Sequence, residues 1–431
     1  MKLFNKIKNI SLLLATGAVF LTACNKLELD PVANPQPAQS ATPTLAALLD
    51  DPSFSILKAA VQKAATFTTP PALSILQQLS VPSLRFTVFA PDDAAFASSG
   101  ISSPAILAGF TAGLLDTILR YHIVPQVIAS SSIPSSFPNF QYPTILNPKP
   151  SVSALLRLTT FPSVRSGVGA WVNNIPIIAT DIQAVNGVLH KVARVIAPPS
   201  TPLWSRIATD PDLTYLKAAI ERADSGTVAT VGTLNTNNLQ SVLTEFGPNL
   251  TVFAPSNAAF QAVLYAAGYP AVYRQLYTGA YNQAISGGAT PAQAAGIATA
   301  YATANAPAYT TGLISLPTIF QDTALFGILP AQSVKGILVY HILGSRAFSV
   351  NLPATPANQP TLLNTVVPSH PGVTLSATFT GLSVTAATVK GAANATAANI
   401  AINPTPNPNG TSDQHFINGV MHKIDQVLRP Q

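Results

Sequence analysis

The chain has 431 residues, which is long enough for two or three domains. Only 9% of the residues are charged, against about 25% in an average soluble protein, yet 48% are hydrophobic. This balance excludes a chain that is disordered through charge repulsion. The 38 prolines interrupt most stretches that would otherwise form long helices, so coiled coils and helical solenoids are disfavoured.

The formal net charge of +6 does not indicate a nucleic-acid partner. Lys2, Lys6 and Lys8 lie in a short leader, and removing these three lysines from the +6 leaves +3, spread along the chain without a basic cluster. We therefore expect no nucleic-acid binding. Cys24 is the single cysteine, which excludes an intrachain disulfide and a cysteine-rich zinc site.

Residues 1–23 have the organisation of an export signal. The lysines precede an uncharged apolar run at residues 10–21, which is too short to span a membrane. The run leads into Leu21-Thr22-Ala23-Cys24, which resembles a bacterial lipobox. The resemblance implies a lipoprotein signal peptide, cleavage before Cys24 and lipidation of its sulfur. A plain secretory signal with an incidental cysteine is the alternative.

Lipidated Cys24 is the expected membrane attachment, because several acyl chains on one residue anchor a protein firmly. Residues 24–43 are rich in proline and are expected to form a tether. Asn25 favours the outer membrane in the lipoproteins that this leader resembles. We expect the outer membrane of a Gram-negative bacterium, with the protein facing the exterior or, alternatively, the periplasm.

Four blocks of sequence occur twice in the same order, which indicates a duplication. The predicted domains are residues 44–199 and 200–431. The second and third blocks lie much farther apart in the second copy, which places an insertion at about residues 265–320. The block pairs are DPSFSILKAAV (51–61) with DPDLTYLKAAI (210–220), FTVFAPDDAAF (86–96) with LTVFAPSNAAF (250–260), ILRYHIVP (118–125) with ILVYHILG (337–344), and VNGVLHKVARVIAP (185–198) with INGVMHKIDQVLRP (417–430).

Each block has a predicted local structure. Asp51 and Pro52 suit the start of a helix whose apolar residues follow at helical spacing. Residues 86–90 alternate as a strand does, and Asp92 after them, or Ser256 in the second copy, can cap a following helix. The Asn-Gly pairs at 186–187 and 418–419 predict hairpin turns that lead into an apolar strand. Helices followed by strands in each copy predict an α+β fold.

In this order, the blocks resemble the fasciclin domain. The resemblance rests on the TVFAP strand, the central Tyr-His pair and the terminal NGV block with its histidine, each present twice. It implies a bacterial lipoprotein with two tandem fasciclin-like domains. Each would be a wedge-shaped β-sandwich flanked by short helices, the second with a helical insertion. It also implies a role in adhesion and no catalytic activity.

Asp-Ile and Tyr-His pairs have been linked with receptor adhesion in the family that the chain resembles. By that resemblance, Tyr121-His122 and Asp181-Ile182 are candidate ligand-binding residues in the first copy. The second copy keeps Tyr340-His341. Its Asp-Ile pair before the NGV block is missing, and we expect no equivalent acid there.

Four of the six histidines recur between the copies, His122 with His190 and His341 with His422. One hypothesis is a metal site, which would need a third ligand such as Asp181 in each domain. The other is that each ring is half-buried and bonds backbone groups, fixing a helix to a strand. We expect the second arrangement, with no metal and no cofactor.

The sequence contains no motif of a serine hydrolase, a zinc protease or a nucleotide-binding protein. Most of the 16 carboxylates are scattered singly. The adjacent pairs at 50–51 and 92–93 lie at expected helix starts, where capping accounts for them. We therefore expect no enzyme and no catalytic residue.

The insertion holds seven of the eleven tyrosines. Five of them recur at every fourth residue from 265 to 281, which places them as a stripe on one helix face. Gly268, Pro270 and Gly279 are expected to weaken or bend that helix, and Pro270, Pro291 and Pro307 to break the insertion. The stripe either packs on the domain as a cap, or forms a platform on which Tyr269, Tyr273 and Tyr277 bind a glycan or a protein.

The sequence thus predicts a cell-surface lipoprotein for adhesion or binding, whose ligand is matrix, a glycan or a partner protein. Two alternatives stay open: a glycan-binding component of an outer-membrane uptake system, and a periplasmic structural lipoprotein. All three are non-catalytic and use Cys24 as the membrane attachment.

Overall fold

The computed structural model describes residues 42–67, 73–135, 137, 139–230, 232–321, 329–403 and 410–431. Contacts group Thr42–Gln431 into one unit. The leader, Cys24 and nearly all of the tether lie outside the described residues, so the expectations about them stay predictions, as do the domain boundaries. Within the described ranges, no helix combines the length and the hydropathy of a membrane span.

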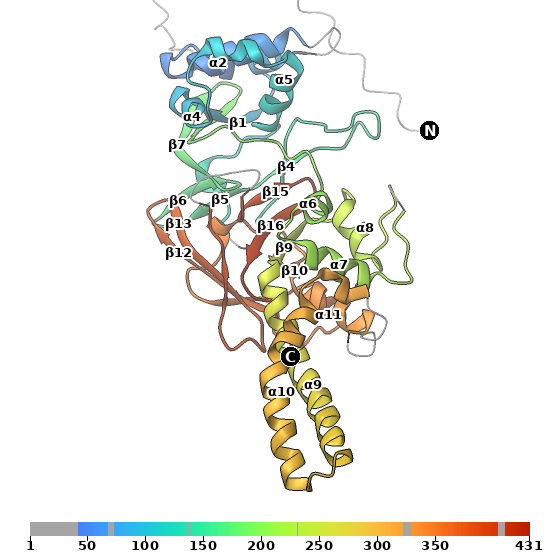
Figure 1. Ribbon diagram of the computed structural model, residues 1–431. Coiled ribbons are helices and arrows are strands. Elements are labelled where there is room, and N and C mark those ends of the chain that lie inside the picture. Colours follow the sequence, from blue (N-terminus) through green and yellow to red (C-terminus); the bar gives the residue numbers. More distant parts are fainter. Residues whose placement is uncertain are drawn as a thin grey trace, which may run out of the picture. The chain divides into compact units, whose positions relative to one another are not determined.

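In copy 1, the predicted domain of residues 44–199, the helices come before the strands except for β1, which lies between α3 and α4 (Figure 1). Six strands form a sheet in the order β2-β1-β8-β7-β6-β5, in which β1 and β8 pair in parallel and the other neighbours antiparallel; β3 and β4 form a separate pair. The helices are α1 (Leu45–Leu48), α2 (Ser55–Ala65), α3 (Ile75–Ser80), α4 (Asp93–Ser98) and α5 (Ala112–Tyr121). The strands are β1 (Phe86–Pro91), β2 (Ile123–Val124), β3 (Tyr142–Pro143), β4 (Thr159–Thr160), β5 (Pro162–Arg165), β6 (Gly169–Val172), β7 (Ile175–Ala184) and β8 (Gly187–Val192).

Copy 2, residues 200–431, repeats this order around a sheet of eight strands, β10-β9-β16-β14-β13-β12-β11 with β15 paired to β16. Again the TVFAP strand, β9, pairs in parallel with the strand after the NGV turn, β16. The helices are α6 (Leu203–Thr209), α7 (Thr214–Ala223), α8 (Leu239–Thr244), α9 (Asn257–Ser286), α10 (Pro291–Ile314) and α11 (Ala331–Tyr340). The strands are β9 (Leu250–Pro255), β10 (Ile342–Leu343), β11 (Ala357–Gln359), β12 (Val373–Thr380), β13 (Ser383–Lys390), β14 (Ala398–Ile400), β15 (Gln414–Phe416) and β16 (Gly419–Ile424).

Strand β1 is buried on both faces, so each sheet separates two cores. Phe86 and Val88 pack with the helices of copy 1, whereas Phe89 points to the opposite face and packs with residues of β6 to β8. In copy 2, Val252 packs in the helical core and Phe253 packs in the core on the opposite face of the sheet. The predicted α+β class, with two tandem copies and a helical insertion in the second, is confirmed.

The predicted caps and turns are present. Asp92 accepts a hydrogen bond from the Ala95 N–H at 2.9 Å, and the Ser256 hydroxyl accepts one from Ala259 at 3.2 Å, so both side chains cap the helix after the TVFAP strand. Gly187 starts β8 at φ 151°, and a Cβ there would lie 1.9 Å from the Phe86 carbonyl oxygen. The parallel pairing of β8 with β1 therefore requires glycine at this position.

One buried cluster joins the two copies. Its members from copy 1 are Phe161 and Trp171, and those from copy 2 are Phe348, Val350 and Val420. Each side chain is at most 7% exposed. Removing this apolar surface from water stabilises the contact between the copies.

Candidate functional site

The His122 ring connects α5 to the segment after β8. Its Nδ1–H donates to the Ile118 carbonyl oxygen at 2.8 Å, and its Nε2 accepts from the Ile196 N–H at 2.9 Å. Because the Nε2 lone pair already accepts a hydrogen bond, these partners fix the tautomer. Neither ring nitrogen of His122 is free to bind a metal.

His341 repeats this arrangement in copy 2. It donates to the Ile337 oxygen and accepts from the Leu428 N–H, both at 2.8 Å. Burial lowers the pKa of His122 and of His341 to about 4, so both rings are neutral at neutral pH. The hypothesis that these rings bond backbone groups is confirmed. The expectation that they are half-buried is wrong, because His122 and His341 are 2% and 1% exposed, and each joins its helix to the segment after a strand rather than to the strand itself.

The tyrosines before these histidines are fully buried. The Tyr121 hydroxyl donates to the Thr159 oxygen at 2.9 Å, and the Tyr340 hydroxyl donates to Gly372 at 2.6 Å. Burial raises the pKa of both phenols. Tyr121-His122 and Tyr340-His341 therefore support the fold from inside, and a direct contact with a ligand would require them to be exposed first.

Asp181 holds the loop after β2. Its carboxylate accepts hydrogen bonds from the N–H of Ser130, at 2.9 Å, and from the Ser130 hydroxyl. Its own N–H donates to Nδ1 of His190 at 3.1 Å, and the other ring nitrogen donates to the Ile128 oxygen at 2.8 Å. Burial raises the pKa of Asp181, but the bonds from Ser130 outweigh it and hold the pKa below its usual value.

The expectation that copy 2 lacks this acid is wrong. Asp413 binds the N–H and the hydroxyl of Ser349, each at 2.6 Å, and donates to Nδ1 of His422 at 3.3 Å. Asp413 and Asp181 both have positive φ, 53° and 60°. The signal was in the spacing, because each acid stands nine residues before its histidine. Only the isoleucine is lost, since Gln414 takes the place of Ile182.

The half-buried Ile182 packs against the helical core of copy 1. The two Asp-His-Ser arrangements are therefore built alike and serve the fold in both copies. Across the described ranges, no three or more His, Cys, Asp or Glu side chains come together as a metal ion requires. The adhesive role predicted for the Tyr-His and Asp-Ile pairs stays a prediction.

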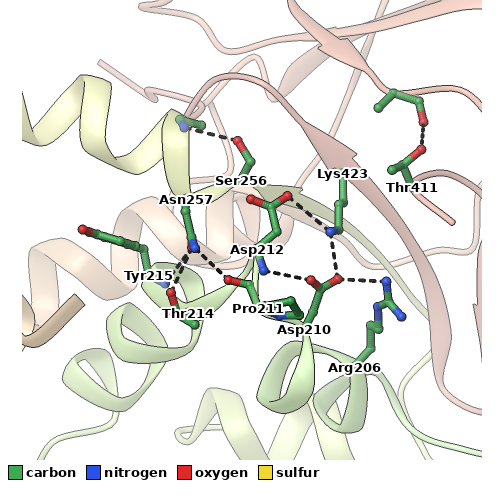
Figure 2. A network of polar contacts seen from close by, with 12 residues as sticks. Arg206, Asp210, Pro211, Asp212, Thr214, Tyr215, Ser256, Asn257, Thr411 and Lys423 are labelled. Carbon is green, nitrogen blue, oxygen red and sulfur yellow. Dashed lines mark hydrogen bonds and ion pairs between the residues drawn. The ribbon is translucent and has the colours of Figure 1, made fainter. Parts of the chain in front are cut away.

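The first block of copy 2 forms an ion-pair network (Figure 2). Lys423 of β16 lies 2.8 Å from Asp210 and 3.3 Å from Asp212, and Arg206 lies 2.9 Å from Asp210. Burial raises the pKa of Asp210, but the hydrogen bond from Lys423 lowers it by more. The pKa of Asp210 therefore lies below its usual value. Asn257 extends the network by donating to the Pro211 oxygen at 2.9 Å. The network joins α6, β16 and the start of α9.

The insertion forms a helical hairpin in which α9 and α10 lie side by side (Figure 1). Gly268 of α9 faces Thr310 of α10, since a Cβ on the glycine would lie 3.7 Å from the threonine methyl group. Alanines at every fourth position of α10 let the two helices approach closely. The alanines, all fully buried, are Ala294, Ala298, Ala302 and Ala306.

The expectation that proline breaks these helices is wrong. Pro270 lies inside α9 and Pro307 inside α10, both on exposed positions, while Pro291 is the first residue of α10. A proline inside a helix removes one backbone hydrogen bond and costs about 3 kcal/mol. The many alanines and the packing of each helix along the other offset that cost.

The tyrosine stripe of α9 runs along the hairpin, and its placement on one helix face is confirmed. The rings of Tyr265 and Tyr269 stack with centroids 5.7 Å apart, Tyr269 and Tyr273 lie 6.1 Å apart, and Tyr277 and Tyr281 also 6.1 Å. All five side chains are half-buried. Tyr265 packs on the domain core, and each of the others has the ring of a neighbouring tyrosine of the stripe beside it. Ligand binding by Tyr269, Tyr273 and Tyr277 stays a prediction.

A second stripe, which sequence reasoning missed, lies on the outer face of α10. Ile297, Tyr301, Tyr309 and Leu313 are 52%, 44%, 56% and 42% exposed. They are four or eight residues apart, a spacing visible in the sequence after Pro291. We call these four residues the outer stripe. Exposed apolar side chains that share one helix face make this face a candidate interaction site.

Comparison with known proteins supports the resemblance to the fasciclin domain that the repeated sequence blocks indicated. A sequence model of the fasciclin domain matches residues 52–198. Transforming growth factor-beta-induced protein ig-h3 of Sus scrofa is 30% identical over 168 residues, 37% of this chain and 20% of the relative. Protein sll1483 of Synechocystis is 30% identical over 148 residues, 34% of this chain and 68% of the relative. The chain belongs to the fasciclin-domain family.

Among solved structures, the chain is similar to a FAS1 domain pair from the insect cell adhesion molecule fasciclin I. The identity is 14% and the TM-score 0.29, over 80% of this chain and 88% of that chain. The matched region spans one fifth of the pig relative.

Proposed function

We propose that this chain is a non-catalytic adhesion or binding lipoprotein, attached to the outer membrane through lipidated Cys24 and facing the exterior. Its ligand is a surface protein or a glycan. The observation that carries the binding role is the α9–α10 hairpin with its outer stripe. The family membership supports the same role, because fasciclin domains are found in cell adhesion proteins.

The hairpin extends beyond what the core of copy 2 needs. Only its base, with Phe260, Leu264 and Ile314, belongs to the buried core of that copy. Copy 1 passes from α4 to α5 with no such hairpin, and its core is closed. A long insertion on a domain that already has a core is a common place for binding function.

The hairpin is almost uncharged. From Asn257 to Ile314 the single charged residue is Arg274. Contact through the outer stripe therefore relies on burial of apolar area and on hydrogen bonds to the tyrosine hydroxyls. Such a contact should change little with salt concentration, because salt screens only interactions between charges.

The anchoring part is tested by Cys24→Ser. Without the thiol, the chain has no site for the diacylglyceryl group, so the variant should leave the membrane fraction or accumulate as an uncleaved precursor. Labelled fatty acid and cell fractionation measure this, and protease shaving of whole cells separates an exterior from a periplasmic location. Fatty-acid incorporation into Cys24→Ser would contradict the proposal.

The binding part is tested with purified chain on an array of glycans and matrix proteins. The variant Ile297→Ser, Tyr301→Ser, Tyr309→Ser replaces three of the four side chains of the outer stripe and should lower the bound signal about tenfold, because exposed aromatic anchors carry much of a binding energy. The matched control is Leu155→Ser with Val366→Ser, which removes apolar side chains 88% and 78% exposed outside the hairpin. Equal signals from both variants would contradict the proposal.

A further inference from the structure

The outer stripe of α10 has the same order of side chains when it is read from either end. Asn305 fills the gap between its two tyrosines, so the row at every fourth position is Ile297, Tyr301, Asn305, Tyr309 and Leu313. Asn305 is the centre of this row, with one tyrosine and one aliphatic residue on each side. The row is therefore symmetric about its middle residue.

The row lies along an open flank of the hairpin. Each of its residues follows a buried residue of α10 by three positions, and those buried residues are Ala294, Ala298, Ala302, Ala306 and Thr310. Four-residue steps keep the two rows in a constant relation, so the row of Asn305 runs beside the contact with α9 rather than in it. Asn305 is half-buried, and the outer stripe is 42–56% exposed. The outer stripe is thus open to a partner along its length.

Helix α10 carries no charge that would select or repel a partner. Between Pro291 and Ile314 the sequence contains no Asp, Glu, Lys, Arg or His. A charged ligand would find nothing to pair with here, whereas a second α10 meets this face without repulsion between like charges. The absence of charge therefore favours a partner with the same uncharged surface.

We propose that the outer stripe binds the outer stripe of a second copy of this chain, with the two α10 helices antiparallel and a two-fold axis at Asn305. In this pairing Ile297 faces Leu313 of the second copy, and Tyr301 faces Tyr309. A contact with two-fold symmetry requires a surface that is complementary to itself. The symmetric order of the row supplies this in the antiparallel direction, because each side chain meets one of its own kind.

Asn305 fixes the register of the pair. Its Nδ2 donates to the Tyr301 carbonyl oxygen at 2.7 Å, which uses one of its two amide protons. An amide also has a second N–H and an acceptor oxygen, so the two Asn305 side chains at the axis exchange two hydrogen bonds. A shift by one turn would place each amide against a tyrosine and lose both bonds. A single polar residue in an apolar contact sets the register in this way.

The antiparallel direction follows from the two ends of α10. Ile314 lies in the core of copy 2, whereas Pro291 follows the turn from α9 at the tip of the hairpin. Packed helix axes lie about 8–10 Å apart, which is less than the radius of gyration of a domain of about 100 residues, about 13 Å. Two domains at the same end of parallel helices would therefore collide, and antiparallel helices keep them at opposite ends.

The contact is small, so the pairing is weak in solution. Tyr301 and Tyr309 are 44% and 56% exposed, which together equals one whole tyrosine, or about 200 Å². With the aliphatic residues, two copies bring together about 600 Å², roughly half of what a stable interface buries. Lipid-anchored copies share one surface, where their effective concentration is far higher than in solution. The inference rests on the proposed function, because it names the partner of the outer stripe.

The experiment is sedimentation of the full chain at increasing concentration. Every sample carries Cys24→Ser, which removes the only thiol and the expected lipid. We expect a monomer–dimer equilibrium. Asn305→Arg and Asn305→Asp each place two like charges at the axis and should weaken the dimer at least about tenfold. An equimolar mixture of the two variants pairs opposite charges and should restore the dimer.

The matched control is Thr303→Arg, which adds the same charge at an exposed position two residues away. Two residues are about 200° around the helix, so this arginine lies on the other side of α10 and should leave the dimer unchanged. A chain that stays monomeric up to about 1 mM would overturn the proposal. Equal effects of Thr303→Arg and Asn305→Arg would overturn it as well.

Cysteines test the direction of the pairing. Ile297→Cys and Leu313→Cys change positions that are 52% and 42% exposed, so the fold should tolerate both. Under mild oxidation, a mixture of the two single variants should form disulfide-linked dimers, whereas either variant alone should form few. Linkage of each variant to itself would show a parallel pair and contradict the antiparallel arrangement.

The two proposals can fail separately. If the unaltered chain is monomeric while the triple serine variant still loses its signal on the array, the outer stripe binds a different partner. The proposed function then stands, and the pairing of two copies is wrong.

Discussion

Arg346 donates through Nη1 to Nε2 of His415 at 2.7 Å, at the junction of the two copies. Arg346 is buried over the ring of Phe161, 4.6 Å from its centre, and its Nε donates to Asn249 at 2.8 Å. Burial and the nearby charge of Arg346 hold the pKa of His415 well below its usual value. A second positive charge on His415 would face Arg346 directly, so protonation of His415 would destabilise this buried pair.

Lowering the pH should therefore destabilise the protein at pH values well above those at which carboxylates titrate. His122, His341 and His415 have lowered pKa values when folded, so the unfolded chain binds more protons and stability falls as the pH drops below about 6.5. Between pH 7 and pH 5 the loss is about 2 kcal/mol for each of His122 and His341. Urea unfolding at the two pH values measures it. An unchanged free energy of unfolding would contradict the neutral, buried rings.

Replacing either helix-fixing histidine should cost stability in the same way. His122→Ala leaves the Ile118 oxygen and the Ile196 N–H unpaired in a buried site, and His341→Ala does the same in copy 2. Each should lower the free energy of unfolding by about 2–4 kcal/mol. A chelator should leave the melting temperature of the unaltered protein unchanged. A chelator effect as large as that of the substitutions would restore the metal hypothesis.

The equivalence of Asp181 and Asp413 predicts matched effects in the two copies. Asp181→Ala and Asp413→Ala each remove a carboxylate that binds a serine N–H and hydroxyl, and place alanine at positive φ. We expect each to destabilise by about 2–3 kcal/mol. Thermal unfolding compares them directly. If Asp413→Ala left the thermal stability unchanged while Asp181→Ala lowered it, the two acids would not be equivalent.

The hairpin should be removable without loss of the fold. Gly268 and Thr310 face each other across its base, so a short Gly/Ser bridge between them spares Leu264 and Ile314 in the core. We expect the shortened chain to unfold cooperatively with a melting temperature close to that of the full chain. Aggregation, or loss of the unfolding transition, would show that the tyrosine stripe belongs to the core.

Local sequence identified much of the fold, because caps, turns and alternation depend on neighbouring residues. Asp92 and Ser256 cap as expected, and the duplicated NGV turn begins β8 and β16 as its glycine requires. The helix itself was expected, but its unbroken course through Pro270 was not, because the stability of α9 comes in part from packing along α10. Asp413 was missed because the acid was expected in an Asp-Ile pair. Its spacing of nine residues from His422 identifies it instead.

The candidate site was harder to predict, because burial is decided by the whole fold. Tyr121-His122 has the residue types of a binding motif, yet both side chains are buried, Tyr121 in a core cluster and His122 in a bond to Ile196. The contact between the copies includes a bond from Asn139 to Asn351, although 212 positions separate them in the chain. No local pattern marks such a pair. The outer stripe, by contrast, follows from helical spacing once α10 is recognised as a helix.

The most direct test of the adhesive role compares cells that display the full chain with cells that display the chain shortened from Gly268 to Thr310, at equal surface amounts. Both are washed over the same array of glycans and matrix proteins. The proposal predicts that the full chain retains cells on particular array positions and that the shortened chain loses them. Equal retention of both on the same positions would show that adhesion does not use the hairpin.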